Sequence, residues 1–172
     1  MGFVGGGDFV KAQSQGMEER ALSILQRLVS THPKEEIREE LQGWIRSGKV
    51  HVALSNRIPS MSAGFMRGTR QETLSVNPTF MFGTWQPSTA EDWKYKQLVI
   101  YHEHRHFREH FNGEVFFVTQ SEFQAEAPVE TAERQWRGEL SAELATWNFA
   151  KEAGIQHLMP RFQRAVAGLV PS

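Results

Sequence analysis

The sequence has no cysteine among its 172 residues. Disulfide bonds and thiolate metal ligands are therefore excluded, and histidine and the carboxylates are the strong metal ligands that remain. No run of 18 apolar residues occurs, so no segment is expected to span a membrane. The first residues carry neither a cationic stretch nor a long apolar one, and we therefore expect a soluble, cytoplasmic protein without a secretion signal.

Charge of one sign is not concentrated anywhere in the chain. Nineteen Lys and Arg residues are interleaved with 20 Asp and Glu residues, and the formal net charge is −1 at pH 7. The absence of a basic stripe argues against nucleic acid or an anionic membrane as a partner. The length suits one domain with a substantial core. We expect residues 1–16, rich in Gly, Gln and Ser, to form a flexible tail, and residues 17–172 to form this single domain.

Helical periodicity marks most of the chain. Two N-terminal helices are expected, one from Met17 to about His32 and one from Pro33 to a stop at Gly48. The capping box Ser88-Thr89-Ala90-Glu91 predicts the start of a third helix, which ends at Asn112-Gly113. Two further helical segments are expected, at 128–153 and 156–169.

Alternating apolar and polar residues follow Gly48 and predict strands at 49–54, 63–66 and 72–77, the last two joined across residues 67–70. These strands would form a small, mostly antiparallel sheet. Breakers predict a loop over 78–88, and a further strand or buried connector is expected at 114–118. The predicted helices together with this small sheet indicate an α+β fold.

The third predicted helix contains the motif His102-Glu103-x-x-His106. Because a helix turns about 100° per residue, His102 and His106 lie on nearly the same face, one turn apart, where two imidazoles can hold one tetrahedral metal ion. Glu103 then lies beside the metal, where a carboxylate can take a proton from a water. This spacing is typical of zinc hydrolases.

A catalytic zinc usually has three protein ligands, so a third must come from elsewhere. The candidates are His104, His110, Asp92, Glu139 and Glu143. His104 is turned about 200° from His102, and His110 lies a further turn along the helix, beyond bonding distance of the same ion. A carboxylate from a second helix is the easier solution, and helical geometry leaves Glu139 and Glu143 both open. The small neighbours Gly138 and Ala142, which allow close helix packing, favour Glu139.

His102-Glu103-x-x-His106, followed by Glu139-x-x-Ala142 on a second helix, resembles the gluzincin branch of zinc metallopeptidases, and the small size is similar to that of minigluzincins. The resemblance implies a zincin-like fold, with a small sheet packed on an active-site helix and a glutamate-bearing helix. It implies that His102, His106 and Glu139 hold Zn²⁺, with Glu103 as general base. It also implies that substrate lies extended along the strand at 72–77, where it adds main-chain hydrogen bonds to an exposed sheet edge.

These residues predict a zinc-dependent peptidase that acts on a peptide or protein substrate, with Glu103 accepting the proton of a zinc-activated water. Tyr95, Tyr101 and His110 are the candidates for holding the oxyanion. The alternative is a non-catalytic regulatory or interaction domain that binds metal on a zincin-like fold. Such a domain has no use for Glu103 as a base, so an intact Glu103 favours the enzyme.

Overall fold

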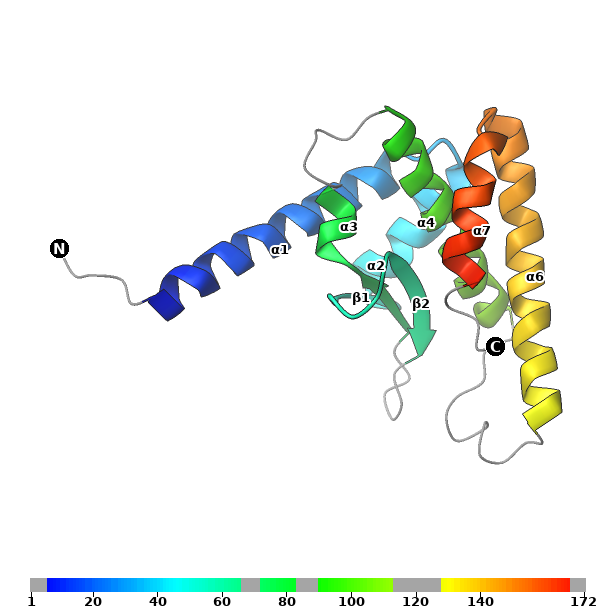
Figure 1. The fold of residues 1–172 in the computed structure, drawn as a ribbon, viewed down its shortest axis with the longest axis horizontal. Helices are drawn as coiled ribbons and strands as arrows, with labels where there is room; N and C mark the ends of the chain where they lie inside the picture. The colour runs from blue at the N-terminus through cyan, green and yellow to red at the C-terminus, as the bar shows by residue number, and fades with distance from the viewer. Residues whose placement is uncertain (1–5, 66–71, 83–89, 113–127, 168–172) are drawn as a thin grey trace.

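The computed structural model describes residues 6–65, 72–82, 90–112 and 128–167, and it has the predicted α+β content, with helices predominating over one three-stranded sheet (Figure 1). The strand expected at 114–118 and the capping residues Ser88 and Thr89 lie outside these ranges. The described elements are α1 (Gly6–Ser30), η1 (Ile37–Leu41), α2 (Gln42–Ser47), β1 (Val50–Leu54), β2 (Met61–Phe65), β3 (Glu72–Val76), α3 (Pro78–Phe82), α4 (Ala90–Phe111), α6 (Pro128–Ala153), η2 (Gln156–Leu158) and α7 (Met159–Ala167).

Helix α1 begins at Gly6 rather than near Met17, so it includes most of the segment expected to be a flexible tail. Its first half projects away from the rest of the molecule (Figure 1). The extension is understandable because residues 11–15 include Lys, Ala and two Gln, which are good helix formers, and adding residues to an existing helix avoids the cost of nucleation. The second half buries Leu25 and Leu28 in the core.

The second helical segment contains a π-helical turn, η1, followed by α2. The π turn buries Ile37 and Leu41 in the core. Gly48 has φ = 78°, in the left-handed region that favours glycine, which confirms the predicted stop. Gly154 ends α6 in the same way, with φ = 70°.

The sheet is mixed, with the strand order β1-β3-β2. β2 is antiparallel to β3, but β1 is parallel to it, so the prediction of a mostly antiparallel sheet is wrong for one of the two pairings. The reason lies in the connection 55–60, which crosses the end of β3. Asn77 holds this connection by donating from its amide to the Ser60 carbonyl (2.8 Å) and from Nδ2 to the Ile58 carbonyl (2.6 Å).

The strand expected at 72–77, along which the gluzincin resemblance places the substrate, is β3. It is paired on both sides and is therefore the central strand of the sheet. The expectation of an open edge there is wrong. Within the described residues, the open edges belong to β1 and β2.

Residues 78–82 form the short helix α3 instead of the predicted loop. Asn77 caps it, because its Oδ1 accepts from the Thr79 amide at 2.9 Å. Pro78 then occupies the first helical position, where a missing amide proton costs nothing. An Asn-Pro pair thus ends the strand, as expected, and also starts a helix.

Helix α4 is the centre of the molecule. It packs against β2 on one side and against α6 on another, and its apolar residues Leu98, Ile100 and Phe107 are fully buried. Helices α6 and α7 lie next to each other at one side of the molecule (Figure 1). No helix in the described ranges is long and apolar enough to cross a membrane.

His32 connects the end of α1 to this central helix. Its Nε2 lies 2.9 Å from the Gln97 carbonyl, and its Nδ1 accepts from the Lys34 amide at 3.0 Å. The ring is therefore neutral, with its proton on Nε2. Burial, together with the charges of Arg38 and Lys34, lowers the pKa of His32 from 6.5 to about 4, although the bond to Gln97 opposes this.

We expect His32 to make stability depend on pH. Between its folded and unfolded pKa values the unfolded chain binds a proton that the folded chain does not, so stability falls as the pH falls. From about pH 7.5 to about pH 5 the His32 contribution should be a loss of about 2 kcal/mol. Denaturant unfolding at both pH values measures the loss in the free energy of unfolding. This loss should be smaller for His32→Gln than for the wild type, and the exposed His51→Gln is the control. Equal losses in the wild type and His32→Gln would contradict the expectation.

Candidate metal centre

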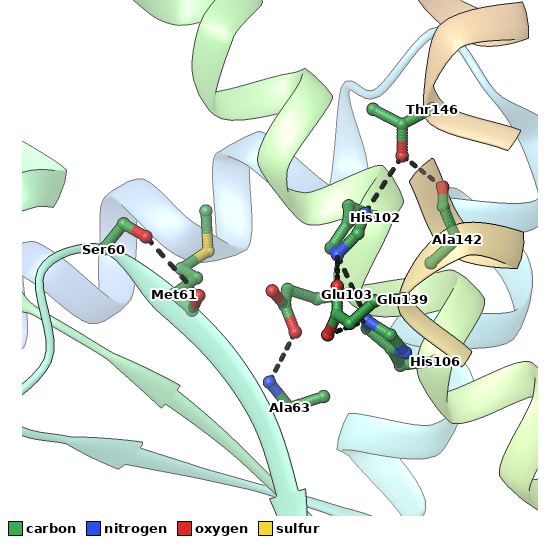
Figure 2. Close-up of polar contacts among 9 residues, drawn as sticks. All are labelled: Ser60, Met61, Ala63, His102, Glu103, His106, Glu139, Ala142 and Thr146. Carbon is green, nitrogen blue, oxygen red and sulfur yellow. Dashed lines mark hydrogen bonds and ion pairs between the residues drawn. The ribbon is translucent and has the colours of Figure 1, made fainter. Parts of the chain in front are cut away.

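Three side chains from two helices, α4 and α6, converge where these helices face each other (Figure 2). His102 and His106 lie one turn apart on α4, are each 3% exposed, and have their Nε2 atoms 3.1 Å apart. Glu139 of α6 places Oε2 3.3 Å from His102 Nε2 and Oε1 3.2 Å from His106 Nε2. The three ligand atoms lie within 4.8 Å of one another, so the structure contains the group that could hold a metal ion.

Close packing of α4 and α6 brings Glu139 into this position. Gly138 and Ala142, the small residues on either side of it, are both buried. Glu143 instead accepts a hydrogen bond from Gln163 of α7 at 2.8 Å. Of the two glutamates that helical geometry left open, the structure therefore brings Glu139 to the histidines.

The other candidate ligands have partners elsewhere. His104 stacks on Trp44 of α2, with ring centroids 5.4 Å apart, on another side of α4. Asp92 pairs with Lys96 at 2.5 Å. His110 lies 3.0 Å from Glu72, at the start of β3.

The three candidates for the oxyanion role each have other contacts in the structure. The guanidinium carbon of Arg161 lies 3.9 Å from the centroid of the Tyr95 ring, and the Tyr101 ring stacks on Phe149 of α6. His110 follows His106 by a further turn on the same face of α4 and pairs with Glu72 of β3.

Glu103 points from α4 toward the sheet (Figure 2). Its side chain is 6% exposed, and its Oε2 accepts a hydrogen bond from the Ala63 amide of β2. Burial raises the pKa of Glu103, and the nearby His102 and His106 together with the Ala63 amide oppose this effect. The carboxylate thus lies beside the candidate ligands without belonging to their group.

The electrostatics of the cluster suit a cation. Burial alone would raise the pKa of Glu139, but its contacts with the two imidazoles lower it well below its usual range. Burial lowers the pKa of His106, but Glu139 and Glu103 outweigh burial and raise it. Glu139 Oε2 is buried and has no hydrogen-bond donor within the described part of the chain. A bound cation would provide this oxygen with a partner. Two imidazole nitrogens and one carboxylate are also a suitable ligand set for a divalent metal ion.

Two residues at this centre were not predicted from the sequence. Thr146 of α6 lies with its Oγ1 3.2 Å from His102 Nδ1, and the ring of Phe162 in α7 meets the His102 ring edge to face at 4.8 Å. Thr146 follows Glu139 by seven residues, or two helical turns, so it shares a face with Glu139. This spacing is the sequence signal that could have identified it.

In comparisons with known proteins, no family model, curated protein or solved structure matches this chain. The resemblance to gluzincins therefore stays a prediction from the sequence motif.

We expect purified protein to bind about one zinc ion per chain at this centre. His102→Ala and His106→Ala should abolish binding, and Glu139→Ala should weaken it strongly, because each removes one of few strong ligands. Glu143→Ala is the matched control, one helical turn away on α6. Competition with a chromophoric chelator measures these affinities, and a stronger effect from Glu143→Ala than from Glu139→Ala would reassign the third ligand.

Proposed function

We propose that this protein is a zinc-dependent peptidase. The observation that carries the proposal is the convergence of His102, His106 and Glu139, with the Glu103 carboxylate beside them on α4. Two imidazoles and one carboxylate are a ligand set that zinc hydrolases use, with the fourth position left for water or substrate. When bound, zinc supplies a Lewis acid that polarises a carbonyl and lowers the pKa of water.

Glu103 is the general base in this proposal. It accepts a proton from the attacking water and passes the same proton to the leaving amine. Burial raises its pKa toward the working range of such a base. The Ala63 amide holds one carboxylate oxygen and thereby orients the other, so the sheet positions the base.

Replacing Glu103 by Gln should preserve zinc binding and reduce peptide hydrolysis by about 10²- to 10⁴-fold, because an amide cannot accept the proton. The matched control is Glu109→Gln, which changes another buried glutamate of α4, one that accepts from Ser141. Turnover on an unstructured protein substrate, measured beside metal content, checks both. Unchanged turnover in Glu103→Gln would favour the non-catalytic metal-binding domain.

We place the peptide substrate along β2, the edge strand beside Glu103. Asn77 donates to the Ser60 carbonyl, which makes these two residues a hydrogen-bonded pair of the β2–β3 ladder. The pairing alternates along an antiparallel ladder, so Ala63 and Phe65 direct their backbone groups away from β3. The bond from the Ala63 amide to Glu103 agrees with this direction. An extended peptide can add to this edge by main-chain hydrogen bonds.

A proline at position 65 tests this placement. Phe65→Pro removes an amide that faces outward, so it should spare the pairing with β3 while weakening peptide binding more than Phe65→Ala does. One lost hydrogen bond should raise KM by about three- to tenfold over the alanine variant. Equal KM values in the two variants would contradict the placement along β2.

A further inference from the structure

The geometry points to Thr146 as the positioning residue that fixes the proton of His102 on Nδ1, so that the Nε2 lone pair faces the metal centre. The inference rests on the metal centre of the proposed function and explains how this chain prepares it. Both contacts lie within the described residues: one joins His102 of α4 to Thr146 of α6, and the other joins Thr146 to Ala142 within α6 (Figure 2).

The direction of the hydrogen bonds follows from counting protons. The Thr146 hydroxyl has one proton and lies 2.7 Å from the Ala142 carbonyl, which can only accept. Ala142 is the nearer of the two neighbours, so the hydroxyl proton is assigned to its carbonyl, and the hydroxyl oxygen presents lone pairs to His102 Nδ1 at 3.2 Å. Nδ1 must then be the donor. A neutral imidazole carries one N–H, so Nε2 is left unprotonated and free to bind a cation.

Glu139 could accept the His102 proton on the metal-facing side of the ring, so another residue is needed to hold this proton on Nδ1. Glu139 Oε2 lies 3.3 Å from His102 Nε2, so the carboxylate offers the ring proton an acceptor on the metal-facing side. A proton held there would block the nitrogen that must bind the metal. His106 Nε2, 3.1 Å from His102 Nε2, also faces this side of the ring. Thr146 provides the competing acceptor on the opposite side, next to Nδ1.

Burial makes this contact difficult to replace. Thr146 is fully buried and His102 nearly so, and Phe162 packs against the ring. If the hydroxyl were removed, a buried Nδ1–H would lose its partner, whereas the proton on Nε2 would retain Glu139. Thr146→Val should therefore shift the proton to Nε2. Thr146→Ser keeps the hydroxyl and should restore the wild-type state.

The tautomer can be read without metal or substrate. Long-range ¹H–¹⁵N correlation spectra of the metal-free protein with ¹⁵N-labelled histidine distinguish a protonated from an unprotonated ring nitrogen. We expect the His102 proton on Nδ1 in the wild type and in Thr146→Ser, and on Nε2 in Thr146→Val. The wild-type spectrum decides the tautomer even where the valine variant does not fold.

Zinc affinity supplies the second readout. Loss of a partner that orients a ligand typically costs 10- to 100-fold in metal affinity, and we expect a loss of this size for Thr146→Val and at most about threefold for Thr146→Ser. Thr73→Val is the matched control because Thr73 is a buried threonine of β3. It should change neither the tautomer nor the affinity.

A wild-type His102 that carries its proton on Nε2 would overturn the inference, and so would a Thr146→Val variant with wild-type zinc affinity. Expected tautomers and affinities in a protein that cleaves no peptide would support the role of Thr146 and contradict the peptidase. The failure of one proposal is therefore distinguishable from the failure of the other.

Discussion

The packing of α4 against α6 is the contact on which the candidate centre depends. Small residues beside Glu139 let the helices approach closely enough for a carboxylate of one to reach two imidazoles of the other. A bulky side chain at Ala142 would separate the helices and remove Glu139 from His102. The same contact positions Thr146 against the far nitrogen of that ring. One helix pair thus supplies the candidate ligands, and also the residue that orients one of them.

The rest of the fold provides partners for the polar groups that α4 buries. A buried polar group without a partner is costly, and this helix carries several, including charged ones. β2 offers the Ala63 amide to Glu103, Trp44 of α2 stacks on His104, and Ser141 donates to Glu109. These contacts tie the sheet, α2 and α6 to a helix that would otherwise be too polar for the core. The scaffold is therefore arranged around the polar faces of α4 as much as around its apolar residues.

Local signals made much of this structure predictable from the sequence. The stops at Gly48 and Gly154, the extent of α6 and the shared face of His102 and His106 depend on neighbouring residues and follow from helical periodicity. The parallel pairing of β1 with β3 does not, because it depends on a connection that crosses the end of a strand and is held by Asn77. The role of Thr146 was not predicted, because it depends on contact with the His102 ring on another helix. The choice of Glu139 lay between these cases, since its neighbours favoured it but tertiary packing decided.

The central claim is that α4 and α6 together hold one metal ion. Anomalous diffraction at the zinc absorption edge, on crystals of the zinc-loaded protein, locates the ion directly. The account predicts one strong peak within about 2.0 to 2.2 Å of the Nε2 atoms of His102 and His106 and of one Glu139 oxygen, with a further position not filled by protein. A peak elsewhere in the molecule, or a site closed by four protein ligands, would contradict the account.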